Sequence, residues 1–469
     1  MVPSSRRAAL LLGCYLVPAA LAAAAPSPES RWLQQYLRFD SSNPPGNEAA
    51  AAEWLAARFA ERSIAAEILT SPAGRANLVA LLPANSTTPP TGGIAASRER
   101  IVLLHHIDVV PAGDRSGWRH DPFAGELAGG SLWGRGAIDA KGLGIAHLAA
   151  FLDLAARQDR TRDLLFLATA DEEAGGREGV GWLFESRPDL FAGVVAVLNE
   201  GGTGKSVGGR PLWWGIEVDQ KRPLWLAVTA RGREGHGSSA EIASASHRLV
   251  EGLARVLATA PALRGSPSAV RYLEALGRHD PRAARAAREG ARLGAGTPPE
   301  ELDRSALVGY ENLFRDSLQV TTLRGSERIN VVPGEARAEI DVRLLPETDE
   351  RLFLDEIRRR LGAGLELDVM LRSPPATASP TDNAVYRTIA EHLRQEAPVV
   401  PAFLPAFTDA RYFRTRGIPA YGLSPFTFDA LELLTVHAPD ERISLAAFDR
   451  GVARMKGLVR DLVTERPTR

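Results

Sequence analysis

The sequence has 469 residues, of which 45% are hydrophobic and 24% charged, and these values are typical of a globular protein. Its 56 basic and 57 acidic residues give a formal net charge of −1, without a long run of lysine and arginine. This balance argues against a nucleic-acid or anionic-membrane surface and favours a small molecule or a peptide as the substrate. The length exceeds that of one ordinary core, so we expect two domains.

The first residues of the chain, 1–25, predict an export signal peptide. Arg6 and Arg7 precede an apolar stretch, and the alanine run that follows suits cleavage near Ala24 or Ala25. We therefore expect an exported protein, located in the periplasm or secreted.

Other interpretations of this N-terminus are a twin-arginine signal, which the segment SRRAAL faintly resembles, a permanent membrane anchor and a lipoprotein. Pro18 interrupts the apolar stretch, which argues against an anchor, so we expect no membrane span in the mature chain. The apolar stretch before Cys14 is very short, which argues against lipidation there. Cys14 is the only cysteine, so a metal site in the mature protein must be built from histidine and carboxylates.

The region after this signal alternates between helical and strand-like patterns. Residues 30–39, 47–62 and 142–157 have helical spacing of apolar side chains. Apolar strand-like segments begin at Ile101 and Asp163, and a third begins near residue 193. Continuous apolar strands separated by helices predict an α/β layer with a mostly parallel sheet, in which chemistry lies beyond the carboxyl ends of the strands.

From about residue 224 the pattern changes to a period of two, which is typical of a half-exposed antiparallel sheet. In residues 335–346 this period separates an apolar face (Ala336, Ala338, Ile340, Val342) from a charged face (Arg337, Glu339, Asp341, Arg343). Helical patterns at 245–260 and 270–296 lie between such strands, and the second is rich in alanine and arginine. The α/β pattern returns after Pro346 and ends in an amphipathic helix at 445–463, so the smaller α+β domain is expected to be an insertion.

His106 and Asp108 follow the strand that begins at Ile101 and form an H-x-D pair. Such a pair can place an imidazole on a metal while the carboxylate orients its surroundings. By itself the pair is weak evidence, because a histidine at a strand end is more often an ordinary hydrogen-bonded residue.

Further loops carry the same kinds of side chain. Glycines around Asp139 allow a tight backbone approach, Glu172 and Glu173 follow the strand that begins at residue 163, Glu200 follows the next one, and His437 lies far downstream. Adjacent carboxylates repel one another unless a cation lies among them. Several strand-end loops with these residues indicate a metal site more strongly than any one of them.

These motifs together carry a family resemblance. The segments HIDVVPAG, GRGAIDAKG, TADEEAGG, NEGG, GHGSS, RINVVPGEARAEIDVRLLP and VHAPDERIS occur in this order. In this respect the chain resembles the di-zinc metallopeptidase family of carboxypeptidase G, aminoacylase, acetylornithine deacetylase and succinyl-diaminopimelate desuccinylase. The resemblance implies a zinc-binding catalytic α/β domain (26–220 and 346–469) and an inserted lid and dimerisation domain (221–345), which would form a homodimer.

The resemblance also implies the metal ligands. Asp139 would bridge two Zn²⁺ ions, His106 and Glu200 would complete the ligands of one ion, and Glu173 and His437 those of the other. Carboxylates and imidazoles suit Zn²⁺ and also accept Co²⁺ or Mn²⁺.

Catalytic and substrate-binding roles follow from the same resemblance. Glu172 would act as the general base, and Asp108 would support His106. His236 would stabilise an oxyanion in the active site of a neighbouring subunit, and Asn330 and Arg343 would hold the substrate's carboxylate. The alternatives are a glycine-rich turn for His236 and a solvated sheet face for Arg343.

The sequence departs from the family pattern in three places. His105 stands where a small residue is usual, Asn199 replaces a frequent aspartate, and the glycine pair usual before Thr408 and Asp409 is missing. None of these changes removes a ligand.

The function expected from the sequence is zinc-dependent hydrolysis of an amide bond next to a free carboxylate, in a C-terminal peptide bond or an N-acyl amino acid. One alternative is a di- or tripeptidase that recognises a free amine. Another is a non-catalytic binding homologue, which is disfavoured because all candidate ligands and the base are present.

Overall fold

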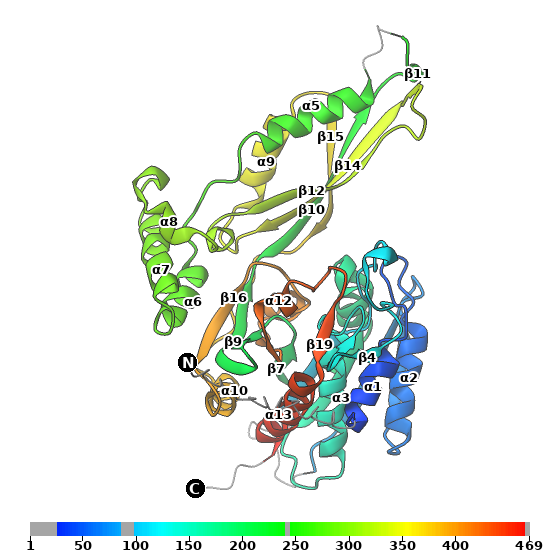
Figure 1. Cartoon of the computed structure of the whole chain (residues 1–469), viewed down its shortest axis with the longest axis vertical. Coiled ribbons are helices and arrows are strands. Elements are labelled where there is room, and N and C mark those ends of the chain that lie inside the picture. Colours follow the sequence, from blue (N-terminus) through cyan, green and yellow to red (C-terminus); the bar gives the residue numbers. More distant parts are fainter. Residues whose placement is uncertain (1–25, 86–97, 240–243, 465–469) are drawn as a thin grey trace, which may run out of the picture.

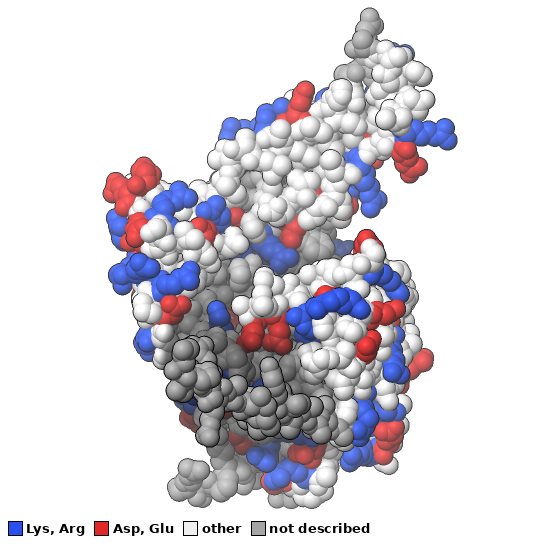
Figure 2. All heavy atoms as spheres, in the orientation of Figure 1, with Lys and Arg blue, Asp and Glu red and all other residues white. Residues whose placement is uncertain are grey.

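The computed structural model describes residues 26–85, 98–239 and 244–464, which form a large α/β part and an elongated second part (Figure 1). The expected signal peptide at 1–25 lies outside the described residues. Among the helices of the described ranges, none has both the length and the apolar character needed to cross a bilayer. Figure 2 shows basic and acidic side chains interspersed over both parts on the visible face.

The large part is built on a ten-stranded sheet with the order β1-β2-β6-β3-β7-β17-β9-β8-β18, in which β16 also pairs with β9. Its strands are β1 (Ala66–Thr70), β2 (Ala76–Leu82), β3 (Arg100–His106), β6 (Asp163–Thr169), β7 (Val194–Asn199), β8 (Thr203–Val207), β9 (Arg210–Gln220), β16 (Val399–Leu404), β17 (Ala420–Gly422) and β18 (Thr427–Phe428).

This sheet is mixed, whereas the sequence predicted a mostly parallel one. The central strands β6, β3 and β7 are parallel neighbours, as expected from their continuous apolar runs, and β17 pairs parallel with β7. The antiparallel pairs β1–β2 and β8–β9 are hairpins with short turns, and a short turn can join only antiparallel strands. These hairpins were not recognised in the sequence because one strand of each, β1 and β8, is short and partly exposed.

Helices cover both faces of the sheet. The helices on one face are α1 (Pro28–Tyr36), α2 (Ala49–Ala60), α3 (Lys141–Ala155), α10 (Ala384–Arg394) and α13 (Leu445–Val463), and those on the other are α4 (Trp182–Ser186) and α11 (Ala410–Arg414). Successive side chains of β6 point to opposite faces of the sheet. Leu164 and Phe166 belong to the core under the first group of helices, and Leu165 and Leu167 belong to the core under the second. Helix α3 is buried almost all round because it packs between the sheet and α13.

The second part is a four-stranded antiparallel sheet with the order β12-β14-β10-β15. Its elements are β10 (Arg222–Arg231), β12 (Ser317–Arg324), β14 (Glu335–Leu344), β15 (Leu365–Arg372), and the covering helices α5 (Ala245–Leu257) and α9 (Glu350–Leu361). The predicted alternation in β14 is confirmed, because its apolar face is buried and its charged face is partly exposed.

The inserted part extends further along the chain than the expected 221–345. Strand β15 pairs with β10 along its length, and α9 contributes Leu354, Ile357 and Leu361 to the same core. The chain therefore returns to the large sheet only after Arg372. Helix α9 followed by β15 continues the helix–strand alternation of the first domain, and for this reason the sequence pattern placed the boundary too early.

Three smaller units complete the chain. The alanine- and arginine-rich segment forms α6 (Pro267–Gly277), α7 (Pro281–Gly294) and α8 (Arg304–Leu307), whose core includes Phe403 of β16. A two-stranded sheet of β11 (Gly235–His236) and β13 (Val331–Val332) lies at the far end of the second part (Figure 1). The last unit is a small sheet of β4 (Glu126–Ala128), β5 (Ser131–Trp133) and β19 (Arg442–Ser444), of which β19 contacts α13, and the short helix α12 (Ala430–Leu433) contacts β18.

Candidate metal centre

The carboxyl ends of three parallel strands bring the candidate ligands together. His106 is the last residue of β3, Glu172 and Glu173 open a 3-10 turn after β6, and Glu200 follows β7. Because β6, β3 and β7 are parallel neighbours, these ends meet at one edge of the sheet. Asp139 reaches this edge from the loop before α3 and completes the first group of ligands.

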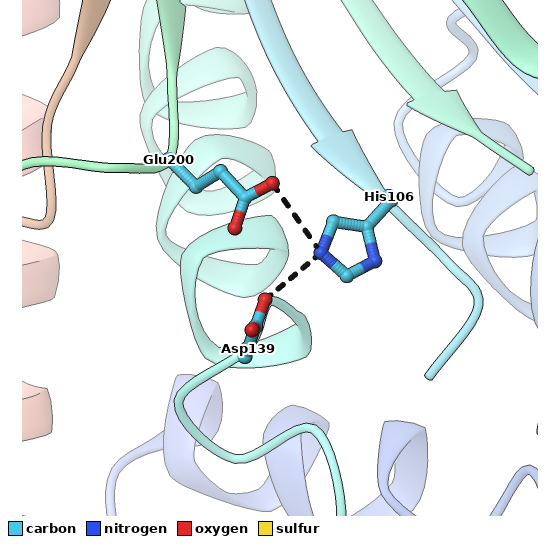
Figure 3. Close-up of side chains that lie close together, drawn as sticks. All are labelled: His106, Asp139 and Glu200. Carbon is cyan, nitrogen blue, oxygen red and sulfur yellow. Dashed lines mark hydrogen bonds and ion pairs between the residues drawn. The ribbon is translucent and has the colours of Figure 1, made fainter. Parts of the chain in front are cut away.

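Two groups of potential ligands share Asp139. In the first group, Nε2 of His106 lies 3.0 Å from Oδ1 of Asp139 and 3.5 Å from Oε1 of Glu200 (Figure 3). In the second group, Nε2 of His437 lies 3.1 Å from Oδ2 of Asp139 and 3.5 Å from Oε1 of Glu173. Within each group the ligand atoms lie within 4.8 Å of one another. Asp139 thus offers one oxygen to each group, which is the arrangement of a bridging carboxylate.

The chemistry of these residues fits divalent cations. Nδ1 of His106 donates a hydrogen bond to the carbonyl oxygen of Asp108 at 2.8 Å, so Nε2 is the ring atom left to face Asp139 and Glu200. Oε1 of Glu173 is buried without a hydrogen-bond partner among the described residues. Three carboxylates and two imidazoles are ligands that Zn²⁺, Co²⁺ and Mn²⁺ accept.

The electrostatics of the groups also favour a cation. Burial alone would lower the pKa of His106, but the negative charges of Glu200 and Asp139 raise it well above its usual value. Burial, followed by the charge of Asp139, raises the pKa of Glu200 to about 8. Each shift reflects negative charge concentrated in a buried place, which a bound cation would neutralise.

Glu172 belongs to neither group, although it lines the same cavity. Its side chain is buried, and burial followed by the charge of Glu200 raises its pKa well above the usual value. A carboxylate beside the ligands but outside the groups is free to exchange a proton with water or substrate.

Asp108 fixes the turn that carries Glu172 and Glu173. Its Oδ1 accepts the backbone N–H of Glu172 at 3.1 Å, and its Oδ2 accepts that of Glu173 at 3.1 Å. Asn43 donates to Oδ2 at 2.8 Å. The expected support of His106 comes from the backbone carbonyl of Asp108, while its carboxylate holds the base and one ligand in place.

A second network of buried charges was missed in the sequence. Asp171 accepts hydrogen bonds from Arg75 at 2.9 Å, from Asn43 at 3.3 Å and from the backbone of Glu178 at 3.0 Å, and Arg75 also pairs with Glu48. These partners are distant in sequence, so no local motif links them. The turn sequence NPPG, which begins with Asn43, was the one local signal for a tight turn in this segment.

The tandem histidines point to opposite sides. His106 faces the ligand groups, whereas His105 packs into the apolar core, where its Nε2 lies 3.3 Å from the hydroxyl of Tyr36. A Cβ atom on Gly144 would lie 2.4 Å from the His105 ring, so glycine makes room for this histidine. The spacing to Asp108 therefore identified the histidine that faces the ligand groups.

The other departures from the family pattern lie beside the site. Asn199 donates to the hydroxyl of Thr408 at 3.2 Å, and Gln220 hydrogen-bonds to the same residue. Asp409 is buried, and burial raises its pKa to about 6. These residues support the loop after β16, which forms one wall of the site.

A cavity of about 520 Å³ is lined by every candidate ligand except His106, and also by Glu172 and Arg343. Arg343 extends from β14 of the second part, where both Nε and Nη2 donate to Oδ2 of Asp341 at 3.1 Å. Its guanidinium carbon lies 5.2 Å from the centre of the Phe407 ring. A fixed cation in the same cavity as the ligand groups can bind a carboxylate.

His236 and Asn330 lie away from this cavity. His236 is in β11, and the carbonyl of Asn330 accepts the N–H of Gly237 at 2.9 Å, so the two residues share the far end of the second part. Asn330 and Arg343 were both expected to hold the substrate's carboxylate. Within one chain they lie apart, because Asn330 directly precedes β13 whereas Arg343 lies near the other end of β14. Neither His236 nor Asn330 lines the cavity of its own chain.

Known proteins share sequence and fold with this chain. The family model described as peptidase family M20/M25/M40 matches residues 102–461. Aminoacylase-1 of Sus scrofa is 28% identical over 437 residues, which cover 91% of this chain and 93% of that protein. Succinyl-diaminopimelate desuccinylase of Methylorubrum extorquens is 29% identical over 366 residues, which cover 75% of this chain and 79% of that protein. A solved M20 family metallo-carboxypeptidase from Sulfolobus solfataricus shares the fold, with a TM-score of 0.68 at 18% identity over 92% of this chain and 99% of that one.

Proposed function

The chain belongs to peptidase family M20/M25/M40 and is a hydrolytic enzyme, and from this premise we propose that it cleaves an amide bond next to a free carboxylate. Its substrates are then a C-terminal peptide bond or an N-acyl amino acid. The observation that carries the proposal is one cavity that is lined by the base, by Arg343 and by ligands of both groups.

The proposed metals are two Zn²⁺ ions, one in each group, with Asp139 as the shared ligand. Bound cations supply Lewis acidity and lower the pKa of water. Glu172 takes the proton of the attacking water and returns it to the leaving amine nitrogen. Asp108 holds the backbone of Glu172, so the carboxylate of the base stays directed at the cavity. Arg343 binds the substrate's carboxylate and sets the position of the amide.

A di- or tripeptidase that recognises a free amine is the second candidate. Such an enzyme needs an additional acidic or carbonyl group to bind an ammonium. Among the described residues that line the cavity, every carboxylate belongs to a ligand group or is Glu172. The cation Arg343 therefore favours a substrate with a free carboxylate over one with a free amine as its recognised end.

We also propose a homodimer through the inserted domain. His236 and Asn330 lie together at its far end and outside the cavity of their own chain. A neighbouring subunit would then supply His236 to stabilise the oxyanion, and Asn330 to contact the substrate.

Export is the remaining proposal and rests on residues 1–25. Cell fractionation and N-terminal sequencing test it. A mature protein that begins shortly after Ala25 supports export, whereas a cytoplasmic protein that retains its first residues contradicts it.

The activity is tested with purified protein in two steps. Metal analysis comes first, followed by hydrolysis of a panel of N-acyl amino acids and short peptides, each compared with its C-terminal amide. We expect turnover of the free acids and a loss of at least roughly 10-fold in kcat/KM for the amides, because a charge-assisted pair is lost. Equal turnover of acids and amides, or cleavage confined to peptides with a free N-terminus, would favour the second candidate.

A further inference from the structure

The cavity is lined by both charged and apolar side chains. Its ionisable side chains are those of Glu172, Arg343 and the candidate ligands other than His106, whereas much of the remaining lining is apolar. Three aromatic rings, Trp225, Phe407 and Phe428, are part of that lining. A site built only for a small acetyl group or a polar side chain has no need of this apolar surface.

Trp225 and Phe407 form an aromatic wall that spans the two parts of the molecule. Trp225 is in β10 of the inserted part, and Phe407 is in the loop after β16 of the large part. Their ring centres lie 6.0 Å apart at an angle of 64°, an edge-to-face contact. Both side chains are only partly buried, so each ring leaves apolar surface facing the cavity.

Asp341 holds this wall next to the carboxylate-binding Arg343. Trp225 and Asp341 are direct partners across the β10–β14 pair, and the indole N–H donates to Oδ1 of Asp341 at 3.1 Å. The other oxygen, Oδ2, accepts both hydrogen bonds from Arg343. One carboxylate therefore fixes an aromatic ring and a cation side by side on the same sheet face.

We propose that the site selects substrates that carry a bulky apolar group, aromatic or long aliphatic, close to their free carboxylate. Trp225 and Phe407 are the specificity-determining residues, and Asp341 is a positioning residue that sets the distance between the apolar wall and Arg343. This inference rests on the proposed function. The apolar group can belong to the acyl part or to the amino-acid side chain, and the two sources are separable by experiment.

The expected selectivity follows from the burial of apolar surface. Each additional methylene that is buried improves affinity by a factor of roughly four. A phenyl group placed against the wall is thus expected to tighten binding by roughly 10- to 100-fold relative to a ligand without it.

Binding is measured by calorimetry with the metal-loaded Glu172→Gln variant, so that ligands are held without turnover. The ligands are N-acetylglycine, N-benzoylglycine with a bulky acyl group, and N-acetylphenylalanine with a bulky side chain. We expect at least one bulky ligand to bind 10-fold or more tightly than N-acetylglycine, and the ligand that does so identifies the source of the apolar group. Equal affinities for all three would overturn the inference. This comparison needs no substitution at Trp225 or Phe407.

The wall is then tested by Trp225→Ala and Phe407→Ala in the same background. Each should remove most of the preference, measured as the ratio of the affinities for the bulky ligand and for N-acetylglycine, because an effect of the substitution on Arg343 alters both affinities and cancels in this ratio. Leu323→Ala is the matched control, since Leu323 is 59% exposed in β12 of the same sheet and does not line the cavity. A preference that survives both aromatic substitutions would overturn the assignment of the wall.

Asp341 is tested by Asp341→Asn in the otherwise wild-type protein. Asparagine keeps an acceptor for Trp225 but loses the charge that holds Arg343, so KM should rise several-fold for all hydrolysed substrates while kcat stays within about 2-fold. Glu339→Gln on the same strand face is the control. An unchanged KM, or a fall in kcat alone, would overturn the positioning role.

Hydrolysis of the same three compounds by the wild-type enzyme separates this inference from the proposed function. Selective binding without any hydrolysis would contradict the proposed function and leave the selectivity standing. Hydrolysis of all three with equal kcat/KM, together with equal binding, would support the function and overturn the selectivity.

Discussion

The backbone N–H of Glu172 donates to Oδ1 of Asp108 at 3.1 Å, although 64 residues separate the two in the sequence. The same carboxylate accepts the N–H of Glu173 with its other oxygen. One buried side chain therefore sets the position of the proposed base and of a proposed metal ligand. This contact explains how two adjacent glutamates can serve different purposes, because the turn that carries them is held rigidly from outside.

The first prediction concerns the base. Glu172→Gln should retain both metal ions and lower kcat by roughly 10²- to 10⁴-fold, because the amide cannot take a proton from water. Metal content and steady-state kinetics measure the two effects separately. Glu185→Gln, an exposed residue of α4, is the control and should leave both unchanged. Full activity of the Glu172→Gln protein would sink the assignment.

The second prediction concerns the shared metal centre. Glu173→Gln should weaken metal binding in the group that contains Asp139 and His437, because it replaces an anionic ligand by a neutral amide. Elemental analysis should give close to half of the wild-type metal content, while the group that contains His106 stays filled. Removal of all metal with a chelator should abolish activity, and added Zn²⁺, Co²⁺ or Mn²⁺ should restore it. Unchanged stoichiometry and affinity in the variant would count against Glu173 as a ligand.

The third prediction concerns Asp108. Asp108→Asn leaves one acceptor oxygen for two backbone N–H groups, so the turn at Glu172 and Glu173 should lose part of its support. We expect metal affinity or kcat to fall by roughly 10- to 100-fold, as for other residues that orient metal ligands. Kinetics with excess metal distinguish the two effects, since excess metal corrects a weaker affinity but not a displaced base. Wild-type affinity together with wild-type kcat would show that the turn is stable without this contact.

The sequence predicted the parts of this molecule that depend on local pattern. The alternation in β14 identified its buried face, and the apolar runs identified the central strands whose ends carry His106, Glu172 and Glu200. Adjacent parallel strands end at the same edge of a sheet, so a list of strand-end residues already predicts which of them can meet.

Long-range pairing was outside the reach of these patterns. The boundary after β15 depends on its pairing with β10, and the network of Arg75, Asp171 and Asn43 joins three separate segments. Likewise, the period of two in β14 places Arg343 on a charged face but does not say that this face turns toward the ligand groups. Such relationships are set by tertiary packing, which local periodicity does not encode.

The fourth prediction concerns Arg343. Arg343→Lys keeps the charge but loses the planar fork, so KM for substrates with a free carboxylate should rise by roughly 10-fold or more. The ratio of kcat/KM between acid and amide substrates should fall by a similar factor. Arg337→Lys, on the same face of the same strand, is the matched control, because Arg337 does not line the cavity. An unchanged ratio would remove Arg343 from carboxylate recognition and restore its interpretation as part of a solvated sheet face.

The last prediction concerns His236 and the proposed dimer. His236 lies at the far end of the inserted part, outside the cavity of its own chain. His236→Ala and Glu172→Gln should therefore remove residues that two different subunits contribute to one active site. Each variant alone should be nearly inactive. When the two are mixed under conditions that exchange subunits, random pairing gives about half mixed dimers with one intact site each, so about a quarter of wild-type activity should return. A mixture that stays inactive while mass measurement shows mixed dimers would mean that His236 does not act across the interface, and a monomer in solution would contradict the dimer itself.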